Sequence, residues 1–90
     1  MHISGRVQGV GFRFSMCEAA RQFGARGWVR NRRDGRVEAV VAGSDEVIAS
    51  MLRWAQRGPR AAQVERVETR DAMAGEIARI GDGFEPLPDG

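Results

Sequence analysis

A run of nine residues near the start of the chain, Gly5-Arg6-Val7-Gln8-Gly9-Val10-Gly11-Phe12-Arg13, has the composition of an anion-binding loop. Glycine adopts backbone conformations that point successive N–H groups into one concavity, and such a nest suits a phosphate. A helix beginning at the end of the run would add the unpaired N–H groups of its first turn. The guanidinium of Arg13 adds a permanent charge and several donors that match phosphate oxygens. The run therefore predicts a phosphate site formed by Arg13 and by the backbone of Gln8, Gly9, Val10, Gly11 and Phe12.

The spacing separates this run from two other glycine-rich phosphate loops. A Walker loop requires Lys and then Ser or Thr after its last glycine, whereas Phe12 and Arg13 follow Gly11. A dinucleotide-binding loop requires a third glycine where Phe14 stands. On spacing alone, an ordinary strand-to-helix turn with a surface arginine remains an alternative.

The run resembles a signature of the acylphosphatase family. A second stretch resembles the other signature of that family: Gly27-Trp28-Val29-Arg30-Asn31, followed by Asp34-Gly35-Arg36-Val37-Glu38. Gly58-Pro59, Val64 and Val67 also fit the family's layout. The resemblance implies hydrolysis of acyl phosphates, with Arg13 binding the phosphate and Asn31 positioning a water. Because asparagine is disfavoured in strands, the alternative for Asn31 is a turn-flanking residue that satisfies local backbone groups.

The remaining reactive residue types give no second site. No His, Cys, Asp or Glu cluster has the spacing of metal ligands, so we expect no metal and no cofactor. Cys17 has no histidine near it in sequence and is expected to pack in the core. His2 has no evident acidic partner, and Glu38 is expected to be a solvated surface group.

Length and composition predict one small domain spanning residues 1–90. No apolar run approaches the roughly 18 residues of a membrane span, and no signal-peptide pattern opens the chain. A single cysteine rules out an internal disulfide framework and agrees with a reducing compartment. These features predict a monomer in the cytoplasm with no membrane partner.

The charge pattern argues for a small-molecule partner. All 14 basic residues are arginine, but 12 acidic residues are interspersed among them and the formal net charge is only +2. The aromatic residues do not alternate with arginines as a base-stacking surface would require, so we expect no nucleic-acid partner. A modest positive charge helps to attract a small anion such as an acyl phosphate.

The elements that must position the site follow from periodicity and breakers. We expect a strand at 2–7, a helix at 12–23, a hairpin of 27–32 and 36–42, a helix between Ser44 and Gly58-Pro59, and a strand at 63–70. Ile77 to Ile80 is expected to be loop, and Phe84 to anchor a short edge strand, because Pro86 and Pro88 donate no ladder bonds. The order βαββαβ, with a possible fifth strand, predicts an α+β ferredoxin-like α/β plait with two helices on one face of a mainly antiparallel sheet.

With nucleic-acid binding not expected, two functions remain open. An acyl phosphate releases a carboxylate, whose conjugate acid has a pKa of about 4, so hydrolysis requires positioning and charge stabilisation more than a general acid. The chain would then be an enzyme that uses water directly, with no covalent intermediate. The alternative is a regulatory module that binds phosphate or carbamoyl phosphate, as in the domains fused to the front of hydrogenase-maturation carbamoyltransferases.

Overall fold

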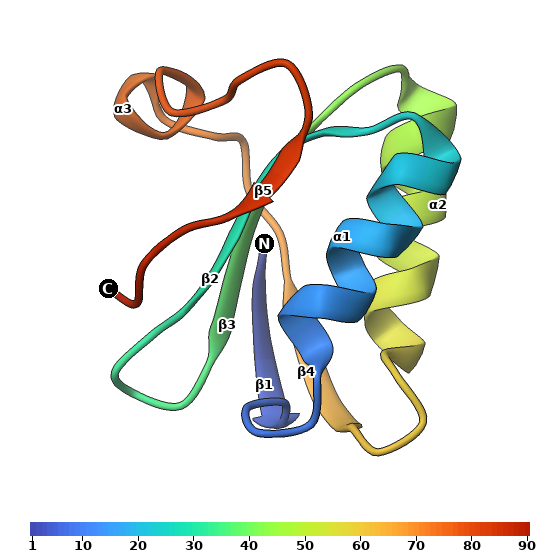
Figure 1. The fold of residues 1–90 in the computed structure, drawn as a ribbon, viewed down its shortest axis with the longest axis vertical. Helices are drawn as coiled ribbons and strands as arrows, with labels where there is room; N and C mark the ends of the chain where they lie inside the picture. The colour runs from blue at the N-terminus through green and yellow to red at the C-terminus, as the bar shows by residue number, and fades with distance from the viewer.

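Five strands form one mixed sheet, in the order β4-β1-β3-β2-β5, in a computed structural model that describes residues 1–90 (Figure 1). The strands are β1 (His2–Arg6), β2 (Arg26–Asn31), β3 (Val37–Ala42), β4 (Gln63–Glu68) and β5 (Phe84–Pro86). The pairs β1–β3, β1–β4 and β2–β3 are antiparallel, and β5 joins β2 in parallel at the edge. The predicted α+β class and the short fifth edge strand are confirmed.

The two long helices, α1 (Phe12–Phe23) and α2 (Asp45–Arg57), cover the same face of this sheet (Figure 1). Each begins and ends as its sequence indicates. Ser44 accepts a hydrogen bond from the Val47 N–H at the start of α2, and Gly24 ends α1 in the left-handed conformation. None of the helices combines the length with the apolar character that crossing a bilayer requires.

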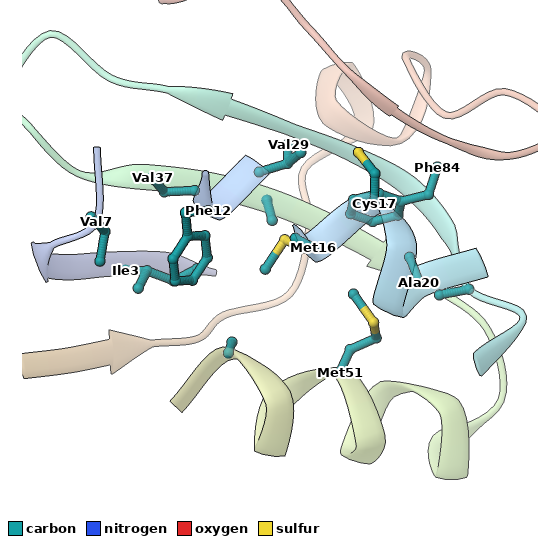
Figure 2. Close-up of a cluster of buried hydrophobic side chains, with 13 residues drawn as sticks. Ile3, Val7, Phe12, Met16, Cys17, Ala20, Val29, Val37, Met51 and Phe84 are labelled. Atoms are coloured by element: carbon teal, nitrogen blue, oxygen red, sulfur yellow. The ribbon is translucent and has the colours of Figure 1, made fainter. Parts of the chain in front are cut away.

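The core between helices and sheet fixes the first turn of α1. Phe12, Met16 and Ala20, spaced four apart, form its buried side, and Figure 2 shows them facing the strands and Met51 of α2. Phe12 is 2% exposed and packs edge-on against the Trp54 ring, with 5.3 Å between ring centroids. Burying a side chain of this size contributes about 1.5–3 kcal/mol, so the residue before Arg13 is firmly anchored.

Residues 78–80 of the predicted loop lie outside any helix or strand, whereas Ile77 ends a single helical turn, α3 (Ala74–Ile77), that was not predicted. It has no buried residue and therefore no apolar pattern from which to predict it. The turn is held by contacts with residues distant in sequence: the Trp28 Nε1–H donates to the Glu76 carbonyl at 3.0 Å. Arg70 donates to both carboxylate oxygens of Glu76, at 2.9 and 2.8 Å.

Glu38 is not the solvated surface group that was expected, and His2 has an acidic partner, contrary to expectation. Glu38 is 5% exposed, and its carboxylate lies 2.8 Å from His2 Nε2 and accepts from Arg30 Nε at 2.8 Å. The His2↔Glu38 register of β1 and β3 brings these distant residues together, which sequence alone does not show. Burial opposes ionisation of Glu38, but its bonds to Arg30 and His2 and the charges of Arg30 and Arg32 outweigh it and lower the pKa of Glu38.

The ion pair between Arg70 and Glu76 of α3 is expected to affect the stability of the protein in acid. Hydrogen bonds from Arg70 and from the Met73 N–H lower the pKa of Glu76 from 4.5 to about 2. A carboxylate with a lowered folded-state pKa contributes stability that is present above its unfolded value and lost as the pH falls through its folded value. We expect Glu76→Gln to lower the free energy of unfolding at pH 7, with the difference from the native protein shrinking between pH 4.5 and 2.

Urea unfolding at pH 7, 4 and 2.5 measures this difference. Glu65→Gln is the matched control, because Glu65 is exposed on β4 and forms no ion pair. A gap between Glu76→Gln and the native protein that stays constant down to pH 2.5 would contradict the ion-pair account of α3.

Candidate active site

The loop between β1 and α1 has the backbone shape that its glycines predict. Gly9 and Gly11 have φ angles of 74° and 76°, in the left-handed region, and no other type of residue in the chain has a positive φ. A Cβ at either position would meet nothing within 4 Å, so glycine is required by the backbone conformation and not by space. Alternation of left-handed and ordinary residues turns consecutive N–H groups toward one side, which is the geometry of a nest.

Seven consecutive backbone N–H groups in this loop and the first turn of α1, those of residues 8–14, donate to no other group of the protein. The first helical bond is that of the Ser15 N–H to the Gly11 carbonyl, at 3.0 Å. Gly11 is the N-cap and has no side chain to satisfy any of these donors. The loop therefore presents a row of free amides beside the positive end of the helix dipole, an arrangement that attracts an anion.

A pocket of about 520 Å³ opens over this loop. It brings Arg13 of α1 together with Asn31, the last residue of β2, and Pro86 of β5 also lines it. The predicted phosphate-binding residues that line it are Gln8, Gly9, Gly11 and Phe12. Val10 does not line the pocket and packs against the hydrophobic core instead, so its side chain anchors the loop.

Asn31 lines the pocket, and no hydrogen bond joins its side-chain oxygen to local backbone. Its Oδ1 is buried and has no hydrogen-bond partner, while its backbone carbonyl accepts from the Gly90 N–H at 3.0 Å. The alternative of a turn-flanking asparagine that satisfies its own backbone is therefore wrong. Leaving a buried acceptor unpaired costs about 1–3 kcal/mol, which is understandable where a bound molecule supplies the donor.

The side chain of Gln8 is used inside the protein. Its Nε2 donates to the carbonyls of Arg32 and Arg36, at 2.8 and 3.0 Å. These two residues close the β2–β3 turn, in which the Arg32 N–H donates to the Arg36 carbonyl at 2.8 Å. The side-chain amide of Gln8 therefore joins the loop to the hairpin that carries Asn31, while its backbone N–H stays free.

Arg13 has a counter-ion that sequence analysis did not find. Its Nη1 lies 3.3 Å from Oδ1 of Asp89, and the two side chains are 39% and 63% exposed. The C-terminal tail is held beside β2 by the bond from the Leu87 N–H to the Val29 carbonyl, at 2.8 Å (Figure 1). Exposed ion pairs contribute about 0–1 kcal/mol, so a phosphate dianion can replace Asp89 at little cost.

Cys17 lies at the wall of the pocket as part of the core. It is 3% exposed, and burial raises the pKa of its thiol although the charge of Arg21 opposes the shift. The predicted packing role is confirmed, and the protonated thiol is a poor nucleophile. No group of three or more His, Cys, Asp or Glu side chains is placed to hold a metal ion.

Together, the sheet and its two helices define a small α+β domain with a row of free amides between its first strand and first helix. The acylphosphatase family model matches residues 1–86. The acylphosphatase of Thiobacillus denitrificans is 51% identical over 89 residues, which are 99% of this chain and 94% of that protein. The chain belongs to the acylphosphatase family of hydrolases.

Solved structures agree with this assignment. The crystal structure of acylphosphatase from Bacillus subtilis superposes with a TM-score of 0.78 at 31% identity, covering 96% of this chain and 92% of that one. The structure of HypF from T. kodakarensis superposes with a TM-score of 0.80 at 29% identity, covering 96% of this chain and 11% of that much longer one. The same fold therefore occurs both as a separate small protein and as a minor part of a large one.

Proposed function

We propose that the chain hydrolyses the carboxyl–phosphate bond of acyl phosphates to a carboxylate and inorganic phosphate, by direct in-line attack of water and without a covalent intermediate. The observation that carries the proposal is the convergence of three features on one pocket. Residues of the loop with its free amides, Arg13 and Asn31 all line that pocket, and Oδ1 of Asn31 has no partner within the protein.

The loop and Arg13 would hold the phosphoryl group. Its oxygens accept from the backbone amides of residues 8–12 (Gln8, Gly9, Val10, Gly11 and Phe12), and the planar fork of Arg13 contributes charge-assisted bonds. Phosphoryl transfer has a loose transition state whose charge is spread over these oxygens, so fixed donors stabilise it without reorganising. The anchoring of the loop by Val7 and Phe12, 1% and 2% exposed, keeps the donors in place.

Asn31 would position the attacking water. An amide accepts through Oδ1 and donates through Nδ2, so one side chain can accept from the water and donate to a phosphoryl oxygen. The water oxygen forms its bond to phosphorus as the bond to the acyl oxygen breaks, and the carboxylate leaves with the electron pair. The proton lost by the water goes to the phosphate product or to solvent. Because the leaving carboxylate is a weak base, no general acid is required.

The proposed partner is a small acyl phosphate, bound by a cytoplasmic monomer. Its single buried cysteine suits a reducing compartment. Nucleic-acid binding on the open face of the sheet has little support, because Trp28 is 1% exposed and the guanidiniums of Arg30 and Arg79 lie over its ring.

A regulatory binding module is the second candidate, favoured by the likeness to 11% of the HypF chain. Hydrolysis of benzoyl phosphate, followed by ultraviolet absorbance in the presence of EDTA, separates the two. Multiple turnovers, with one atom of ¹⁸O from labelled water in each phosphate released, would support the enzyme. Binding of inorganic phosphate without turnover would support the module. A rate abolished by EDTA and restored by Mg²⁺ would contradict the metal-independent site.

Inorganic phosphate is expected to protect the protein against heat, because it resembles the product and binds only the assembled loop. At about 100 times its Kd, a ligand stabilises the folded state by about 2.7 kcal/mol. For a domain of this size that corresponds to a rise in Tm of about 10–20 °C, measurable by circular dichroism. Chloride at matched ionic strength controls for salt. Equal protection of the native protein and of Arg13→Ala would place the phosphate elsewhere.

A further inference from the structure

No hydrogen bond within the protein fixes the side-chain oxygen of Asn31. Its buried Oδ1 has no partner, although this is the acceptor that would align the attacking water. A side chain without such a bond takes its direction from its backbone and from the packing around it. Asn31 is the last residue of β2, where the strand passes into the β2–β3 turn, so its direction depends on what holds the backbone on either side of it.

One carboxylate, that of Glu38 on β3, holds the residues before and after Asn31. Glu38 lies opposite Arg30 in the register of β2 and β3, and its Oε1 accepts from Arg30 Nε at 2.8 Å. The same oxygen accepts from Arg32 Nη1 at 3.4 Å. Successive side chains along an extended strand point to opposite faces of the sheet, so the two arginines lie on one face and Asn31 on the other. The two bonds on one face therefore hold the backbone from which Asn31 projects on the other.

Glu38 is a buried charged group outside the pocket that contains Arg13 and Asn31. Its side chain is 6% exposed, and His2 Nε2 lies 2.8 Å from its second oxygen. Burial raises the pKa of this carboxylate, but the bonds from Arg30 and His2 and the charges of the two arginines lower it by more, so it is ionised at neutral pH. Because Glu38 does not line the pocket, any effect that it has on the reaction must act through another residue.

We propose that Glu38 is a positioning residue for the reaction and acts through Asn31. By holding Arg30 and Arg32, its carboxylate fixes the direction in which the amide of Asn31 meets the water. Desolvation offsets much of the attraction in a buried ion pair, so the main contribution of this one is a fixed geometry. This inference rests on the proposed function of the site and adds to it a residue that does not contact the substrate.

Glu38→Gln keeps the size of the side chain but removes its charge, so both arginines lose a charged acceptor. We expect kcat for benzoyl phosphate to fall by about tenfold, because a misdirected amide aligns the water less often. The Kd for inorganic phosphate should change by no more than about twofold, since the loop and Arg13 are untouched. Glu65→Gln is the matched control and should leave both constants unchanged, because Glu65 is exposed on β4 and forms no ion pair.

Repeating the substitution in Asn31→Ala separates positioning from a general structural effect. If Glu38 acts through Asn31, Glu38→Gln should change the kcat of Asn31→Ala by less than about twofold, because the amide that it positions is already absent. A tenfold fall in both backgrounds would overturn the assignment. An unchanged kcat in Glu38→Gln alone, or an equal loss of phosphate affinity, would also overturn it.

Arg32→Gln replaces Glu38→Gln in these measurements if the latter does not fold. It releases one side of Asn31 and leaves the buried pair of Glu38 and Arg30 intact, and the Arg32 side chain is 33% exposed. We expect kcat to fall by about threefold, with no further fall when Arg32→Gln is combined with Asn31→Ala. A fall by the same factor in both backgrounds, or none in either, would overturn the assignment.

Nuclear magnetic resonance tests the positioning without turnover. The ¹⁵N order parameter of the Asn31 side-chain NH₂ group, measured without substrate, should be lower in Glu38→Gln than in the native and Glu65→Gln proteins. A lowered order parameter with no turnover of any acyl phosphate would contradict the proposed enzyme but support the role of Glu38. Turnover of benzoyl phosphate together with equal order parameters in all three proteins would overturn this inference alone.

Discussion

Replacement of Arg13 by lysine is expected to lower kcat/KM for benzoyl phosphate by about 10²–10³-fold while the protein remains folded. Lysine keeps the positive charge but loses the planar fork that can bind two phosphoryl oxygens at once. The side chain at this position is 39% exposed and its only ion-pair partner is Asp89, so little stability depends on it. The Kd for inorganic phosphate should rise as well, because the product makes the same contacts.

Steady-state kinetics and the far-ultraviolet circular dichroism spectrum of Arg13→Lys check both parts of this expectation. Arg6→Lys is the matched control, since Arg6 ends β1 just before the loop and is exposed without an ion pair. It should retain nearly native activity. If Arg13→Lys turns over as fast as Arg6→Lys, the guanidinium of Arg13 does not contact the reacting phosphoryl group.

Replacement of Asn31 by alanine, unlike that of Arg13 by lysine, is expected to lower kcat and to leave phosphate affinity nearly unchanged. The amide that aligns the water is lost while the loop and Arg13 are retained. We therefore expect kcat to fall by about 10²–10³-fold and the Kd for inorganic phosphate to change by no more than about threefold. Because Oδ1 of Asn31 is buried and unpaired, its removal should not lower the free energy of unfolding.

Single-turnover kinetics measure the fall in rate, inhibition by phosphate measures its Kd, and urea unfolding measures the free energy of unfolding. Asn31→Asp is an informative companion, because aspartate has nearly the same shape but is negatively charged. It should weaken phosphate binding where alanine does not. Parallel loss of turnover, phosphate affinity and folding stability in Asn31→Ala would show that the asparagine is structural.

The parts of the fold that sequence predicts are those decided by local physics. Phe12, Met16 and Ala20 repeat at helical spacing, and Gly24 ends the helix because it adopts a left-handed conformation, with φ 79°. The burial of Glu38 was not predictable, since it requires the pairing of β1 with β3 and two arginines from the neighbouring turn and strand. The turn α3 depends in the same way on tertiary contacts of Glu76.

In the candidate site, too, some features follow from local sequence and others depend on tertiary contacts. The glycines of the loop and the resemblance of two short segments predicted Arg13 and Asn31, and one pocket contains both. The inward packing of Val10 and the bonds of the Gln8 side chain depend on the core and on a turn more than 20 residues away. The places of Asp89 beside Arg13 and of Arg21 in the pocket lining depend on how the C-terminal tail and β5 pack near α1, which sequence alone does not show.

The two bonds from Gln8 to the β2–β3 turn have a consequence for heat inactivation. Many binding loops open locally at temperatures well below those that melt the core. Here the loop is tied to the hairpin on one side by Gln8 and to the core on the other by Val7 and Phe12. Opening it requires breaking contacts that also hold the sheet together. Catalytic activity should therefore disappear in the same cooperative transition as the secondary structure, with no range of temperature in which a folded but inactive protein accumulates.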